Sequence, residues 1–145
     1  MSCLGFDGAL AIGTSDGLLT AASFTPVLGS RDASASVNSD KGNISDRNTK
    51  FKQYVAGGVD VEITATLTQD SHANLDTIRN ACLNRTVIKV GLFTTDVAAS
   101  AEGIVFDAHV FSNDIAQPLT EGQTVSVTFA PAHNSQQYPD WATLT

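Results

Sequence analysis

Hydrophobic and polar side chains alternate along several segments of the chain with a period of two residues. The clearest alternation runs over 59–68, where five apolar residues occupy the odd positions and five polar residues the even ones. Successive side chains of a β-strand point to opposite faces, so this pattern predicts a strand that is buried on one face. The polar residues that we expect on its other face are Asp60, Glu62, Thr64, Thr66 and Thr68.

Similar alternation predicts further strands. It is clear at 123–130, looser at 87–94 and 104–111, and weaker at 6–12 and 31–37. Strands with one apolar and one polar face are typical of antiparallel sheets. Clusters of turn-forming residues separate these segments and predict turns at Ser15-Asp16-Gly17, Lys41-Gly42-Asn43, Gly57-Gly58 and Glu121-Gly122.

One segment departs from the two-residue period and predicts an amphipathic helix at about 72–84. Its apolar stripe consists of Leu75, Ile78, Cys82 and Leu83. Asp70 or Ser71 can cap the start of this helix, and Asn84 is a plausible left-handed stop. We expect this apolar side of the helix to pack against the sheet, which buries it from water.

Together these elements predict a mainly β protein, an antiparallel β-sandwich or small barrel of about seven strands with one flanking α-helix. We expect residues 1–145 to form a single domain, because a chain of this length can bury roughly 68% of its unfolded surface. The two cysteines, Cys3 and Cys82, lack the spacing of a zinc module. The sequence predicts neither a signal peptide nor a membrane span.

Charge is distributed unevenly along the chain. The net charge is -7, but the segment 31–52 carries five bases against three acids. The acidic total disfavours a nucleic-acid-binding protein, which needs clustered Lys and Arg. A basic segment on an acidic body favours head-to-tail contact between copies, although a solvated loop explains the same charges.

Candidate catalytic and metal-binding residues are few. Asp107 and His109 share one face of a predicted strand and resemble half of an acid–base pair with a hydroxyl such as Ser126. This spacing is more typical of a wet strand surface. Asp60 and Glu62 offer two oxygen ligands for a cation, but the local pattern supplies no third carboxylate. We therefore predict no catalytic residue, no cofactor and no metal site.

Four short stretches are more informative together than singly. They are Phe51-Lys52-Gln53-Tyr54 followed by Gly58, Leu75-Asp76-Thr77-Ile78-Arg79-Asn80-Ala81 with Leu83-Asn84, Gln117-Pro118-Leu119-Thr120-Glu121 before Val125, and Pro139-Asp140-Trp141. In order and spacing, over about 6–144, they resemble the major tail tube proteins of long-tailed bacteriophages. The chain departs from the family pattern at Phe51, where Trp is expected, and at Val55-Ala56, where Arg-Pro is expected.

The resemblance implies a β-sandwich with a flanking helix, assembled into six-fold rings that stack into a hollow tube through which DNA leaves the capsid. It implies no cofactor and no chemistry. The partners it implies are further copies of the chain and tail proteins such as the terminator, tape measure and baseplate. The resemblance also implies that DNA passes through without specific binding and that no membrane is involved. The protein is then expected in the virion tail and, before assembly, in the host cytoplasm.

Two features of the sequence suit a tube. The polar side of 59–68 suits a wall facing DNA, because Lys or Arg there would hold phosphates. A plain solvated surface is the alternative, and the hydroxyl face of 123–128 is the next candidate for the wall. The basic stretch 39–52 suits an extended loop that docks on the next ring. Its expected contact residues are Lys41, Arg47, Lys50 and Lys52.

Other functions remain open from the sequence. A monomeric β-sandwich that serves in binding or adhesion is one alternative, but such modules usually display several aromatic residues. An inner tube subunit of a contractile injection system is another. Trp141 either recognises a partner or anchors the tail of the chain on the domain or a neighbour.

Overall fold

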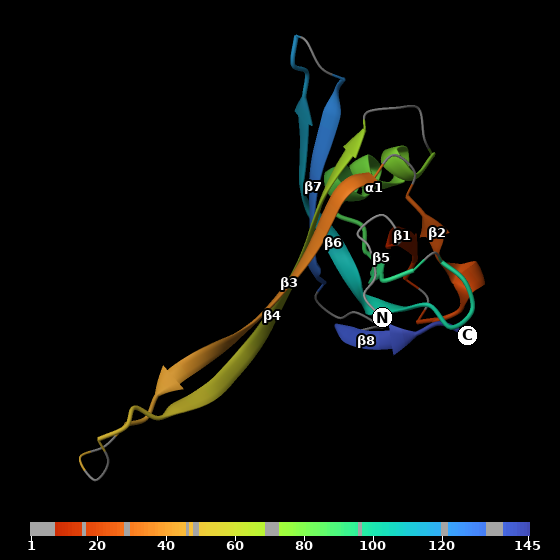
Figure 1. Cartoon of the computed structure of the whole chain (residues 1–145). Helices are drawn as coiled ribbons and strands as arrows, with labels where there is room; N and C mark the ends of the chain where they lie inside the picture. The colour runs from red at the N-terminus through yellow and green to blue at the C-terminus, as the bar shows by residue number, and fades with distance from the viewer. Residues whose placement is uncertain are drawn as a thin grey trace.

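Eight strands form one antiparallel sheet in the described part of the chain, with one α-helix against it (Figure 1). The computed structural model describes residues 8–15, 17–27, 30–45, 47, 50–68, 73–95, 97–119, 122–132 and 138–145. The strands are β1 (Ala9–Thr14), β2 (Thr25–Pro26), β3 (Ser30–Asn43), β4 (Tyr54–Thr68), β5 (Ile88–Phe93), β6 (Glu102–Ala116), β7 (Thr124–Pro131) and β8 (Asp140–Thr143). The helix is α1 (Ala73–Asn84), and η2 (Ala21–Ser23) is a short 3-10 helix. The predicted mainly β fold with one helix is confirmed, although the sheet does not close into a barrel.

The sheet bends at β6, which belongs to both of its halves. The strand order is β2-β1-β5-β6-β7-β4-β3, and β8 also pairs with β6. The first half of β6 pairs with β5 and β8, and the second half pairs with β7. Phe111 is an extra residue in β6 between the pairs made by Val110 and Ser112. Such a bulge bends and twists a strand, which lets one strand serve two halves.

The main core forms where the apolar faces of both halves meet α1. It contains residues of β1, β4, β5, β6, β7 and the helix in one cluster. On β4, the odd positions from Val61 to Leu67 are buried and the even positions are exposed or half-buried, as predicted. Val59 is the exception, because it is 65% exposed. It lies where β4 leaves the body of the protein.

The helix matches its predicted place but not all of its predicted contacts. Leu75 and Ile78 are buried and Cys82 is half-buried, whereas Leu83 is exposed and Ala81 completes the buried stripe. The predicted stop at Asn84 is wrong by one position. Arg85 takes the left-handed conformation with φ 57°, which lets the Thr86 N–H donate to the Ala81 carbonyl oxygen. The caps predicted at Asp70 or Ser71 lie outside the described residues.

The outer parts of β3 and β4 project from the body as a two-stranded arm, the described residues of 37–59 (Figure 1). The turn predicted at Lys41-Gly42-Asn43 is wrong, because these residues pair with β4 as far as Asn43 and Tyr54. The turn predicted at Gly57-Gly58 is also wrong. Both glycines stand opposite the single residue Asp40, as a bulge, and a Cβ on Gly57 would lie 3.1 Å from the Asp40 Cβ.

The far face of the β1–β5–β6 half carries a second, smaller core. Phe24 and Phe93 meet edge to face, with ring centroids 5.2 Å apart. Ala142 and Leu144, in and just after β8, are buried in the same cluster and anchor the end of the chain. Trp141 directly precedes the buried Ala142 but is itself 59% exposed. Of the two roles that the sequence left open for Trp141, anchoring on its own domain is thus provided by Ala142 and Leu144.

Candidate functional site

The strand register brings polar residues of four strands onto one surface. Thr64 of β4 lies opposite Ser34 of β3 on one side and Thr128 of β7 on the other, and Thr128 lies opposite Ser112 of β6. Residues directly opposite each other in antiparallel strands share a face. The two polar faces that the sequence offered as alternatives, on 59–68 and on 123–128, are therefore parts of a single surface.

We call this surface the polar face. Its described members are Asp32, Ser34, Ser36, Asn38, Asp60, Glu62, Thr64, Thr66, Thr68, Ser112, Asp114, Thr124, Ser126 and Thr128. All of these side chains are exposed or half-buried. They comprise four carboxylates, nine hydroxyls and one amide, and no Lys or Arg side chain occurs among them. Every residue predicted to face the lumen belongs to this set.

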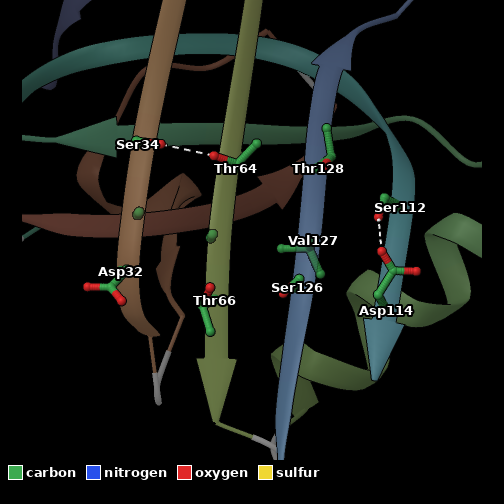
Figure 2. A pocket seen from close by; sticks show the side chains of 11 residues that line it. Asp32, Ser34, Thr64, Thr66, Ser112, Asp114, Ser126, Val127 and Thr128 are labelled. Atoms are coloured by element: carbon green, nitrogen blue, oxygen red, sulfur yellow. Dashed lines mark hydrogen bonds between the residues drawn. The ribbon is translucent and has the colours of Figure 1, made fainter. Parts of the chain in front are cut away.

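The middle of the polar face is an open hollow of about 320 Å³ between Asp32 and Asp114 (Figure 2). The hydroxyls of Ser34 and Thr64 lie 2.9 Å apart and share a hydrogen bond. The Ser112 hydroxyl donates to Asp114 Oδ2 at 2.9 Å. Both bonds run within the surface, which exposes hydroxyls and carboxylates.

The arm carries the four bases predicted to contact the next ring. They are Lys41, Arg47, Lys50 and Lys52, called the arm cations below, and all are exposed. Lys41 Nζ lies 4.5 Å from the ring centroid of Tyr54, and Lys50 Nζ lies 5.8 Å from that of Phe51. Both distances suit a cation–π contact. The arm thus ends in exposed rings paired with positive charges.

The candidate acid–base pair does not form a catalytic site. Asp107 is fully buried, so the wet surface expected for this strand is wrong at that position. Its Oδ2 accepts a hydrogen bond from the Ser15 hydroxyl at 2.7 Å. The His109 ring packs edge to face against Phe111, 5.9 Å between centroids. Ser126 lies opposite Asp114, five positions further along β6 than His109.

Two buried residues of opposite charge, beside the second core, escaped the sequence analysis. Lys89 of β5 lies directly opposite Asp107 of β6, and both residues are fully buried. Lys89 Nζ donates to the Leu18 carbonyl oxygen at 2.6 Å and stands 4.6 Å from the Phe24 ring centroid. Together with Ser15, the pair fixes the loop after β1 against the sheet. Nothing in the local sequence marks Lys89 as buried, because its partners come from distant segments.

The described residues contain no group of three or more His, Cys, Asp or Glu side chains that could hold a metal ion. His72 and His133 lie outside those residues. Over the same residues, no helix is long and apolar enough to cross a membrane. The features that stand out in the described part of the chain are a polar sheet face, a basic arm and a buried pair of oppositely charged residues.

Comparison with solved structures identifies the fold. The chain is similar to a chain in the tail of an empty gene transfer agent particle refined with C6 symmetry, with TM-score 0.79 and 13% identity over 97% of this chain and 99% of that one. It is similar to the SPP1 tail tube chain, with TM-score 0.72 and 12% identity over 89% and 75%. It is also similar to a chain of the six-fold symmetrised anti-feeding prophage baseplate, with TM-score 0.61 and 4% identity over 99% and 96%.

Nearly the whole chain takes part in these likenesses, so the protein has the fold of tail tube subunits. The resemblance expected from the four sequence stretches is thereby confirmed at the level of the fold. Neither a model of a known protein family nor a curated protein sequence matches the chain.

Proposed function

We propose that the chain is a structural subunit of a phage tail tube, built from stacked hexameric rings through which DNA is ejected. The observation that carries this proposal is the polar face with an unpaired edge on each side. β3 is the outermost strand, and beyond Ala108 the described β6 pairs on one side only, with β7. Exposed edges of this kind pair readily with another chain.

Six copies joined edge to edge would enclose a channel of suitable width. Four strands about 4.8 Å apart cover about 19 Å, so six copies give a perimeter of about 115 Å and a diameter of about 37 Å. Strand tilt widens such a ring further. After side chains are added inside, the opening still exceeds the width of a DNA duplex. The six-fold symmetry of the similar gene transfer agent tail supports this copy number.

The charge of the polar face suits a wall along which DNA slides. Its carboxylates, Asp32, Asp60, Glu62 and Asp114, repel phosphates, and its hydroxyls keep the wall wet. A lining of Lys or Arg would bind the DNA backbone through counterion release and hold it. In this proposal Asp60, Glu62, Thr64, Thr66 and Thr68 line the lumen, together with the polar residues of β3, β6 and β7.

The arm is proposed to connect successive rings. The segment 31–52 carries a net +2, while the remainder of the chain carries three bases and twelve acids. Complementary charges steer and orient such a contact. The arm cations would therefore lie against the acidic body of a subunit in the adjoining ring. Further partners follow from this role, namely the terminator, the tape measure and the baseplate, with the host cytoplasm as the place of synthesis before assembly.

An inner tube subunit of a contractile injection system is the second candidate. The likeness to the anti-feeding prophage baseplate chain favours it, although its TM-score of 0.61 is lower than the 0.79 and 0.72 of the other two. Both candidates are hexameric tubes without catalysis, and they differ in whether a sheath surrounds the tube.

Electron microscopy of the purified protein tests the proposal. We expect hollow rings or tubes of uniform diameter at high concentration. A strictly monomeric mass across a wide range of concentration and salt would contradict the tube.

The wall is tested by the double variant Asp60→Lys, Glu62→Lys. Tubes of this variant should retain DNA inside at moderate salt and release it as salt rises, whereas parent tubes should not retain it. The matched control places Lys at Asp76 and Glu102, exposed acids outside the polar face. If variant and control tubes retain DNA equally, the polar face does not line the lumen.

A further inference from the structure

An apolar groove of about 470 Å³ lies at the base of the arm, between the arm and β8. Val37, Val59, Ile104 and Trp141 are among its lining residues. Its floor includes Val61, which belongs to the buried core, whereas Val37, Val59 and Trp141 are largely exposed. The core therefore continues outward into a surface that remains open in the single subunit.

A matching apolar projection lies at the other end of the molecule. Leu119 follows the end of β6 by three residues and is fully exposed, and Ile115 on the same strand end is 52% exposed. Ile104 of the groove lies near the start of β6, so the two features are separated by nearly the whole strand, which is about 40 Å long along its bent course. Figure 1 shows β8 and the end of the β6–β7 hairpin on opposite sides of the body. Leu119 therefore cannot fill the groove of its own chain.

The two ends also differ in charge. The segment 112–123 contains two acids and no base, whereas the arm beside the groove carries the four arm cations. Asp114 lies on the polar face near the β6–β7 end, and its side chain is exposed. Opposite charges therefore accompany the apolar projection and the apolar groove, which favours one orientation of a contact between two copies.

We propose that the groove at the base of the arm receives the β6–β7 end of a second copy, with Leu119 seated against Val59 and Trp141. The acidic segment 112–123 of that copy then lies toward the basic arm. Because groove and projection are different surfaces at opposite ends, the contact is heterologous, and a contact of this kind extends a filament when its rotation does not close. This inference rests on the proposed function, since it defines the contact between successive rings.

Cross-linking tests the contact directly. Two proteins are prepared in a Cys3→Ser, Cys82→Ser background, one with Leu119→Cys and one with Val59→Cys. Mixed under tube-forming conditions and oxidised, they should give a covalent pair of the two different chains, because a disulfide needs close Cβ atoms. Leu83→Cys, at a leucine of α1 that is 73% exposed, replaces Leu119→Cys as the control. If tubes form and the Leu119→Cys mixture cross-links as slowly as the Leu83→Cys control mixture, the proposed contact is refuted.

The concentration threshold for assembly gives a second measurement. Leu119→Ala should raise the protein concentration needed for tubes by about ten-fold, because it removes most of a buried leucine side chain from the contact. Leu83→Ala should leave the threshold unchanged. An unchanged threshold for Leu119→Ala, in protein that forms tubes, rejects the contact and leaves the tube intact. Absence of rings and tubes from the parent protein refutes the proposed function, and this contact with it.

Discussion

Removal of one partner of the buried Lys89–Asp107 pair is expected to destabilise the fold strongly. The two residues lie opposite each other on β5 and β6, and neither is exposed to solvent. Asp107→Leu removes the carboxylate opposite Lys89, whose Nζ also donates to the Leu18 carbonyl oxygen and lies over the Phe24 ring. A carbonyl oxygen and an aromatic ring carry no full negative charge, so they compensate the desolvation of the ammonium less well than a carboxylate does.

The expected loss is about 3–5 kcal/mol, the usual effect of breaking a buried ion pair from one side. Proteins of this size are stable by roughly 5–15 kcal/mol in total, so the variant should be only marginally folded. Since 1 kcal/mol corresponds to roughly 2–4 °C for a domain near this length, the melting temperature should fall by roughly 6–20 °C. Lys89→Met should lower the free energy of unfolding by a similar amount, because it removes the cation opposite the buried carboxylate, which keeps its hydrogen bond from the Ser15 hydroxyl.

The double variant Lys89→Met, Asp107→Leu is the informative comparison. It removes both charges and fills the space with apolar groups, so it should be more stable than either single variant. Urea unfolding of the dilute subunit, with the slope and midpoint fitted for all four proteins, yields the coupling free energy. As the exposed control, Asp76→Ala removes a partner of Arg79 on the surface of α1 and should cost no more than about 0.5 kcal/mol.

Additive losses would refute this reasoning. If the double variant lost the sum of the two single losses, the two charges would not stabilise each other. The burial of Lys89 would then have to be explained by its carbonyl and ring contacts alone.

The remaining predictions concern the core, a close backbone contact and the arm. Ile63→Ala should lower the free energy of unfolding, measured in urea, by about 2–5 kcal/mol, because Ile63 is fully buried. Glu62→Gln, on the exposed face of the same strand, should change it little. Equal losses for the two variants would mean that β4 is buried on both sides. Gly103→Ala should lower the melting temperature far more than Gly58→Ala, because a Cβ at Gly103 would lie 2.1 Å from the Leu92 carbonyl oxygen and Gly58 has nothing within 4 Å. Changing all four arm cations to Glu should prevent stacking of rings, seen by electron microscopy, with little change in melting temperature; normal tubes would exclude the arm from the contact.

The periodicity of hydrophobic residues was sufficient to predict the strands and the helix, whose form depends on residues close together in the sequence. Val61, Ile63, Glu62 and Thr64 alternate, and the strand lies with one face in the core and one in solvent. The helix at 73–84 follows from Leu75 and Ile78 in the same way. Both patterns reflect the fixed geometry of a strand or a helix, which the sequence carries directly.

Contacts between distant segments required the tertiary structure. Gly57-Gly58 has the composition of a turn, but pairing with β3 on the far side of the hairpin makes it a bulge. Lysine is usually exposed, but Lys89 is buried because Asp107, Leu18 and Phe24 contact it from other parts of the chain.

The polar face shows the same division. The sequence by itself determined that 59–68 and 123–128 each carry a hydroxyl-rich side, because that requires only the period of a strand. Only the tertiary structure decided that Thr64 and Thr128 lie opposite each other, and that Ser34 and Ser112 extend the surface on both sides. Register is set by the packing of the apolar faces behind these residues, which are far apart along the chain.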